Sequence, residues 1–162
     1  HRMSSAASDV YKRQVKCHFD LPIVVDVPKN LDDGTPFPTM FWLTCPMYIK
    51  KVSTLESHGM VKELDKQLNS NKKLRKLWSK RQKSYEKERN RKYKSVNNTV
   101  SPIGGVGGAV NSIKCLHSHL ADELVTGKNI VGQIVLENVG GCNCKEPCVV
   151  EGTKNDNWRS EW

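Results

Sequence analysis

The sequence lacks any apolar run that approaches the ~20 residues a helix needs to cross a membrane. It also lacks a charged start followed by an apolar stretch, which is the pattern of a secretory signal peptide. Hydrophobic residues make up only 37% of the chain, a smaller share than compact domains normally have. These absences predict a cytoplasmic protein that does not enter a membrane and that keeps part of its chain outside the core.

Six cysteines are present, but the missing secretory signal argues against a secreted disulfide framework. Thiols stay reduced in the cytoplasm, so we expect these cysteines to bind a metal or to react as thiols. The sequence therefore predicts sites of thiol chemistry rather than cross-links.

The chain, at 162 residues, is long enough for one domain with a sizeable core. Residues 1–14 resemble translated adapter sequence, and we expect a non-native, disordered leader there. Residues 15–140 should form a single domain. Residues 141–162 should form a cysteine-rich motif and a disordered tail.

Alternating strand-like and helix-like segments predict an α+β fold. Three apolar, β-branched segments are typical of strands: 23–27, 39–43 and 130–137. Two segments with apolar residues at helical spacing predict helices: 46–69 and 111–126. Gly59 should end or kink the first helix, and Gly127 should cap the second. We expect a small sheet of three strands, or slightly more, packed against two to three helices, plus one long basic helix.

Positive charge is concentrated in one part of the chain. The net charge is +9, yet residues 62–94 hold fourteen Lys or Arg against four Asp or Glu, a net +10, so the remainder is close to neutral at −1. Residues 72–94 should form a long helix with one narrow apolar seam. Such a helix is usually solvated, but it can also bind nucleic acid or an acidic protein. The candidate nucleic-acid contacts are Lys76, Lys80, Arg81 and Arg89.

Thiolate and imidazole side chains, which zinc and iron–sulfur centres prefer as ligands, are grouped in several short motifs. On a helix that starts near residue 111, Cys115 and His119 lie four residues apart on one face, whereas His117 points elsewhere. Cys45 precedes Pro46 at a helix N-cap, where the dipole favours a thiolate. We predict a zinc or iron–sulfur site with Cys45, Cys115 and His119 as ligands. Cys17 or three tail cysteines would complete it: Cys142, Cys144 and Cys148.

A thiol enzyme is the alternative, with Cys45 as the nucleophile and His117 or His119 as the base. The glycine loop precedes a predicted helix, so its N–H groups could bind an anionic group. Its glycines are Gly104, Gly105, Gly107 and Gly108. The loop lacks the Gly-Lys-Ser/Thr end of a P-loop and is not a dinucleotide fingerprint, so a connector is the other interpretation.

Several motifs, in this order, resemble a bacterial family known as domain of unknown function 501. They are Thr35-Pro36-Phe37-Pro38-Thr39, Phe41-Trp42-Leu43-Thr44-Cys45-Pro46, the Leu55-Glu56 to Gly59 step, the glycine loop and Ile113-Lys114-Cys115-Leu116-His117-Ser118-His119. The resemblance runs from about Val15 to Leu136. It implies a small bacterial cytosolic protein with no established activity. It also implies one shared constellation, without roles: Cys17, Cys45, Cys115, His117 and His119.

Overall fold

The computed structural model describes residues 13–27, 37–93 and 102–158 of the chain. The predicted leader, residues 1–14, lies outside the described residues except for its last two, which begin the first strand. In chain order the elements are β1 (Arg13–Lys16), β2 (Pro22–Asp26), β3 (Phe41–Leu43), α2 (Pro46–Ser57), α3 (Met60–Ser70), α4 (Lys72–Tyr93), the 3-10 turn η1 (Val106–Gly108), α5 (Leu116–Thr126), α6 (Ile130–Val139), β4 (Val149–Val150) and β5 (Thr153–Lys154).

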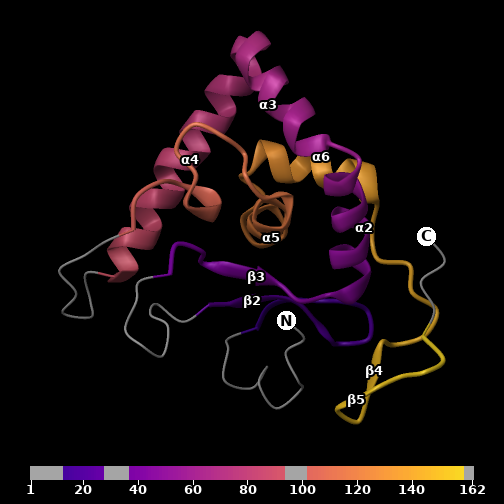
Figure 1. Cartoon of the computed structure of the whole chain (residues 1–162). Coiled ribbons are helices and arrows are strands. Elements are labelled where there is room, and N and C mark those ends of the chain that lie inside the picture. The colour runs from indigo at the N-terminus through magenta and orange to yellow at the C-terminus, as the bar shows by residue number, and fades with distance from the viewer. Residues whose placement is uncertain (1–12, 28–36, 94–101, 159–162) are drawn as a thin grey trace.

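The elements form a roughly triangular arrangement, with the sheet of β1, β2 and β3 along its base (Figure 1). Helices α2 and α4 form the two sides, and α3 lies towards the apex. Helix α5 runs through the middle, where it contacts α2, α6, η1 and all three strands of the sheet. The core is therefore built around α5, which packs against the sheet and against the neighbouring helices.

The sheet is antiparallel, in the order β1-β2-β3, and together with the helices it confirms the predicted α+β fold. The predicted strand over residues 130–137 is wrong, because these residues form α6 and the third strand is β1. Val131, Val135 and Val139 are buried at four-residue spacing along α6. This helical periodicity outweighs the β-branched composition that suggested a strand.

The predicted helix over 46–69 is divided into α2 and α3 at Gly59, whose φ of 87° lies in the left-handed region. A glycine adopts this conformation without strain, which explains the break. Helix α4 confirms the long helix predicted over 72–94. Asn71 separates α3 from α4, and its Oδ1 accepts a hydrogen bond of 3.0 Å from the N–H of Leu74, so it caps α4.

Helix α5 begins at Leu116 rather than near Asn111. Lys114 has a positive φ of 66° and Cys115 is extended, so neither continues a helix. Cys115 is therefore the N-cap of α5. Gly127, with φ 65°, ends the helix, as predicted.

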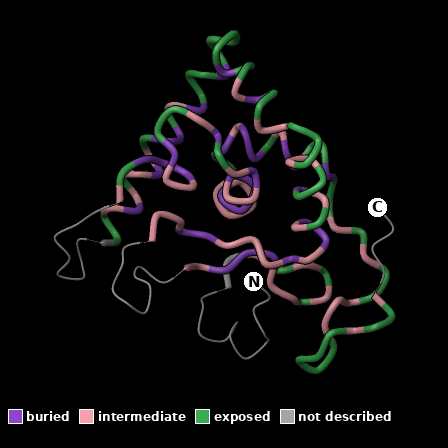
Figure 2. Tube along the Cα trace, in the orientation of Figure 1, coloured by how far each residue is buried: buried purple, intermediate pink, exposed green. Residues whose placement is uncertain are grey.

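Buried residues line the inner sides of the triangle, while much of the outer surface of α2, α3 and α4 is exposed (Figure 2). The apolar seam of α4 consists of Leu74, Trp78 and Tyr85. Three polar residues of the same helix are also buried: Arg81, Gln82 and Arg89. No helix in the described ranges combines the length and apolar character that a membrane crossing requires.

Residues 149–158 form an ordered hairpin and turn instead of the disordered tail expected from their polarity. Trp158 packs against the edge of the core. His18 Nε2 lies 2.9 Å from the carbonyl oxygen of Cys144. This contact joins the C-terminal segment to the turn between β1 and β2.

Substitution of Gly132 by alanine is expected to lower the free energy of unfolding by about 1 to 3 kcal/mol. A Cβ at this position of α6 would overlap the backbone carbonyl of His119 and the Cβ of Glu123 on α5, so the two helices would have to separate. Gly141→Ala is the matched control, since no described atom lies within 4 Å of the Cβ it would add. Chemical denaturation measures the difference, and equal stability of the two variants would contradict the close packing of α5 on α6.

Candidate functional site

Five of the six cysteines line one small cavity at the start of α2. Cys17 comes from the turn between β1 and β2, and Cys45 is the N-cap of α2. The other three come from the segment between α6 and β4: Cys142, Cys144 and Cys148. The cavity has a volume of about 20 Å³, enough for one water-sized particle. Three separate chain segments therefore bring free thiols to one place.

The sulfurs lie around the wall of this cavity rather than at one point. Among the described residues, no three of these sulfurs lie within 4.8 Å of one another. Burial raises the pKa of the Cys45 thiol to about 12, although the backbone N–H groups of Tyr48 and Met47 favour the thiolate. The N-cap effect expected from the sequence is thus outweighed by desolvation. This argues against Cys45 as a free nucleophile.

A second cluster lies at the other end of α2. It contains Glu56 from the last turn of α2, Cys115 from the N-cap of α5 and His117 from its first turn. A carboxylate oxygen, the Sγ atom and a ring nitrogen of these residues all lie within 4.8 Å of one another. Such a Cys/His/Glu group can bind a metal ion. A thiol beside an imidazole is also the composition of a nucleophilic catalytic site.

His117 is held between α2 and α5. Its Nδ1 atom lies 3.2 Å from Glu56 Oε1. Its Nε2 atom lies 3.2 Å from Ser53 Oγ and 3.3 Å from the carbonyl oxygen of Ile49. Glu56 Oε1 also accepts a hydrogen bond of 2.9 Å from the N–H of Leu116, in the first turn of α5, where a negative charge is stabilised. These contacts fix the carboxylate and the imidazole relative to the thiol.

The thiol and the imidazole shift each other's pKa. Burial raises the pKa of Cys115, but hydrogen bonds from His117 and Ser118 outweigh burial and leave the pKa below its usual range. The pKa of His117 is raised, first by its hydrogen bond with Cys115 and also by the charge of Glu56. Opposite shifts in two neighbouring groups favour a thiolate–imidazolium pair.

Helix α2 separates the two clusters. Cys45 and Glu56 are eleven positions apart in the chain, which corresponds to a rise of about 16 Å along a helix. Cys45 lies with Cys17 and the tail cysteines, whereas Cys115 lies with Glu56 and His117. The single constellation predicted from the sequence is therefore corrected to two sites at opposite ends of α2.

His119 belongs to neither cluster. It is 1% exposed, its Nδ1 atom lies 3.1 Å from Asn129 Oδ1, and burial lowers its pKa. The predicted sharing of one helix face by Cys115 and His119 is wrong, because Cys115 precedes the first helical residue. Asn129 Oδ1 also accepts a hydrogen bond of 2.8 Å from the N–H of Gly132, so His119 contributes to the cap of α6.

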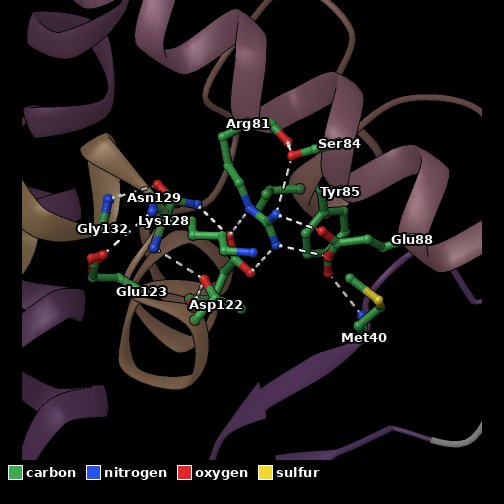
Figure 3. Close-up of polar contacts among 12 residues, drawn as sticks. Met40, Arg81, Ser84, Tyr85, Glu88, Asp122, Glu123, Lys128, Asn129 and Gly132 are labelled. Atoms are coloured by element: carbon green, nitrogen blue, oxygen red, sulfur yellow. Dashed lines mark hydrogen bonds and ion pairs between the residues drawn. The ribbon is translucent and has the colours of Figure 1, made fainter.

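A buried polar network joins α4, α5 and the N-cap of α6 (Figure 3), and Asn129 connects it to His119. Arg81 donates two hydrogen bonds of 2.8 Å to the carboxylate of Asp122. Asp122 Oδ2 also accepts a hydrogen bond of 2.9 Å from Asn129 Nδ2. Glu88 accepts longer hydrogen bonds, of 3.2 and 3.3 Å, from Arg81. Burial disfavours the guanidinium charge, but the bonds to Asp122 outweigh it and raise the pKa of Arg81.

Two of the predicted nucleic-acid contacts point into the protein. Arg81 is 4% exposed and Arg89 is 1% exposed, so neither can reach a phosphate. Lys76 and Lys80 are exposed on α4. Nucleic-acid binding through this helix stays a prediction, with two fewer contacts to support it.

Three polar residues on α4 hold the glycine loop: Gln82, Glu86 and Arg89. Their spacing of four and three residues places them on one face of the helix. Gln82 Oε1 accepts a hydrogen bond of 3.0 Å from the N–H of Val106. Glu86 Oε2 accepts one of 2.8 Å from the N–H of Gly104. Arg89 donates one of 3.2 Å to the carbonyl of Gly105. This face of the basic helix therefore has a structural role.

The anion site predicted at Gly104, Gly105, Gly107 and Gly108 has few N–H groups to offer. The N–H of Gly104 is bonded to Glu86, whose carboxylate would also repel an anion. The N–H groups of Gly105 and Gly108 donate to carbonyl oxygens within the loop. The loop leads into η1 rather than into α5. This geometry favours the connector interpretation.

Residues 13–137 match the model of a protein family described as a protein of unknown function, DUF501. The chain belongs to the DUF501 family. No curated protein and no solved structure matches it significantly. The part that matches the DUF501 model includes all of the second cluster, together with Cys17 and Cys45 of the cavity. The other three cavity cysteines lie beyond it: Cys142, Cys144 and Cys148.

Glu56 is the functional candidate that sequence reasoning missed. It lies in the Leu55-Glu56 to Gly59 step, one of the segments by which the sequence resembles the DUF501 family, and that resemblance is the signal that could have drawn attention to it. The pairing itself spans about sixty residues of chain and depends on how α2 packs against α5. Ser53, three residues earlier and on the same face of α2, was missed for the same reason.

Proposed function

We propose that this DUF501 protein binds one zinc ion in the cavity at the start of α2. The ligands are four of the five thiols that line it: Cys17, Cys45, Cys142, Cys144 and Cys148. The observation that carries the proposal is the convergence of these thiols from three distant chain segments. Thiolates gathered in this way are a usual donor set of a structural zinc site.

The size of the cavity favours a single ion over an iron–sulfur cluster. A volume of about 20 Å³ suits one ion, whereas a four-iron cluster with its bridging sulfides needs more room. Zinc–sulfur bonds of about 2.3 Å require the thiols to turn inward from the cavity wall. Rotation of the cysteine side chains between staggered χ1 positions would move the sulfurs towards the centre of the cavity.

Two hydrogen bonds to sulfur support a role as metal ligands. The N–H of Phe19 donates to Cys17 Sγ at 3.4 Å, and the indole N–H of Trp158 donates to Cys144 Sγ at 3.5 Å. Hydrogen bonds to ligand atoms orient them and tune their charge. The surroundings of these two sulfurs therefore suit thiolates.

The proposed role of the zinc ion is structural. Four protein ligands close a tetrahedral zinc site and leave no position for a substrate. The ion would fasten the C-terminal segment to the β1–β2 turn and to the start of α2. Zinc binding would thus contribute to folding free energy.

Metal analysis of protein purified without chelators tests the proposal. The wild-type protein should contain about one equivalent of zinc, as a closed site of this type holds a single ion. Cys45→Ser should lose most of it, because a neutral hydroxyl replaces a thiolate ligand. Cys115→Ser is the matched control, because Cys115 lies outside the cavity and its loss should leave the zinc content unchanged.

Zinc content that is unchanged by Cys45→Ser would contradict the proposal, and so would iron in place of zinc. Serine variants of the other four cavity cysteines identify the thiol that is not a ligand. Exactly one of these variants should keep the zinc content of the wild type. Loss of zinc in all four would point to a site with a different ligand arrangement.

A further inference from the structure

We propose that Cys115 is a nucleophilic thiol that takes an acyl group from a substrate, with His117 as its acid–base partner and Glu56 as the residue that positions the imidazole. The activity belongs to the second cluster, at the opposite end of α2 from the zinc cavity. It does not depend on the zinc site.

The three groups are assembled by two different helices. Glu56 comes from α2, and Cys115 and His117 come from the start of α5, with their reactive atoms within 4.8 Å of one another. The side chains of His117 and Glu56 are 26% and 30% exposed, and Cys115 is partly exposed. The cluster is thus held rigidly, yet a substrate can reach it from solvent.

A doubly protonated ring satisfies all the contacts of His117. Nδ1 faces a carboxylate oxygen of Glu56, and Nε2 faces the carbonyl oxygen of Ile49 and the hydroxyl of Ser53. The carboxylate and the carbonyl oxygen only accept hydrogen bonds, and the serine hydroxyl can accept one, so donation from both ring nitrogens is compatible with every partner. A positively charged ring beside Cys115 stabilises the thiolate. The N-terminal end of α5 adds positive potential at the same place.

This protonation state argues against a metal ion in the cluster. A histidine ligand coordinates through a ring nitrogen that carries no proton. Metal binding would require His117 to give up its contact with either Glu56 or Ile49. The pKa of His117 is raised and that of Cys115 is lowered, which agrees with a charge pair formed by the two side chains alone.

The thiol lies at the N-cap of α5, where Cys115 is partly exposed. Gly107 lies beside it, since a Cβ at this glycine would be 3.9 Å from the Cβ of Cys115 and from Ser118 Oγ. The glycine loop, residues 104–109, contains no charged side chain. In the part of the chain that the structure describes, His117 of α5 and Glu56 of α2 are charged groups that act on Cys115.

The reaction proceeds in two balanced steps. The thiolate of Cys115 attacks the carbonyl carbon of the acyl donor, a carbon–sulfur bond forms, and the bond to the leaving group breaks. The imidazolium of His117 gives its proton to the leaving group. Water then attacks the thioester, the neutral imidazole takes a proton from it, and the carbon–sulfur bond breaks. The products are a carboxylic acid and the protonated leaving group, and the thiolate–imidazolium pair is restored.

Alkylation and acylation of the full-length protein test the proposal. Iodoacetamide at pH 7, followed by peptide mapping, should modify Cys115 at least about tenfold faster in wild type than in His117→Asn, since each unit of thiol pKa changes the thiolate fraction tenfold. As the pH is lowered, alkylation of Cys115 should remain fast to a lower pH in wild type than in His117→Asn. Treatment with p-nitrophenyl acetate should place one acetyl group on Cys115, which water then removes.

Glu56→Gln keeps an oxygen that can accept the hydrogen bond of Leu116, and it serves as the test if His117→Asn fails to fold. It should move the pH profile of Cys115 alkylation without changing the circular dichroism spectrum. A rate at Cys115 that equals that of a simple thiol, or that neither variant changes, would overturn the proposal. So would the absence of an acetyl group on Cys115. Loss of a bound metal ion in Cys115→Ser, but not in Cys45→Ser, would identify the cluster as a metal site instead.

Discussion

Replacement of Asp122 by alanine is expected to lower the free energy of unfolding by about 3 to 5 kcal/mol. The side chains of Arg81 and Asp122 are 3% and 0% exposed and form an ion pair of 2.8 Å. Removal of the carboxylate would leave the guanidinium buried, with Glu88 as its remaining carboxylate partner among the described residues. It would also leave the amide of Asn129 without its acceptor. Domains of this size have total stabilities of about 5 to 15 kcal/mol, so the variant should be close to unfolding.

Glu88→Ala is the matched control, because Glu88 binds the same guanidinium from a more exposed position. Its side chain is 35% exposed, and the loss of an exposed ion pair costs at most about 1 kcal/mol. Denaturant unfolding followed by circular dichroism, at a fixed zinc concentration, compares the two. Equal losses of unfolding free energy in the two variants would show that burial of the Arg81–Asp122 pair is not the reason for its contribution to stability.

A double variant separates the ion pair from the packing around it. Arg81→Leu combined with Asp122→Leu removes both charges and fills the space with apolar groups. Such exchanges of a buried ion pair are often neutral or stabilising. The double variant should therefore be more stable than Asp122→Ala alone, despite the lost partner of Asn129.

Removal of the proposed zinc ion with a chelator is expected to expose residues 142–158 to rapid hydrogen exchange. Strands β4 and β5 are two residues long, and an isolated two-stranded hairpin is at best marginally stable. A structural zinc site contributes on the order of 10 kcal/mol, so this segment should lose most of its protection when the ion leaves. Mass spectrometry of peptides after hydrogen exchange measures the change.

Helix α5 supplies the internal control for this experiment. It is held by the Arg81–Asp122 network and by its contacts with the sheet, neither of which involves zinc. Peptides from α5 should therefore keep their protection after chelation. Equal exchange of residues 142–158 with and without metal would mean that the cavity cysteines do not fasten this segment.

The long helices could be predicted from the sequence because the residue patterns that indicate them are local. The strongly polar pattern with a sparse apolar seam defined α4, and Gly59 marked the break between α2 and α3. The error at α6 arose because a short, β-branched apolar run is compatible with either a helix or a buried strand. Only the packing of that run against α5 decides between the two.

The candidate sites depended on details that the sequence does not contain. A positive φ at Lys114 delays the start of α5, and this moves Cys115 from a helical position to the N-cap. The partner of the thiol changes from His119 to His117 as a result. Arg81 and Arg89 face inward because distant groups satisfy them: a carboxylate on α5 and carbonyl oxygens of the loops. No local pattern distinguishes these two arginines from their solvated neighbours.

Helix α2 contributes a residue to each of the two clusters, and this constrains the number of residues in the helix. Cys45 at its start lines the cavity, and Glu56 near its end holds His117. One inserted or deleted residue would turn Glu56 by about 100° relative to Cys45 and shift it by about 1.5 Å along the axis. The altered segment would still form a helix, but either Cys45 or Glu56 would no longer reach its cluster. Homologous chains that keep both clusters should therefore vary in the exposed side chains of α2 and not in its length.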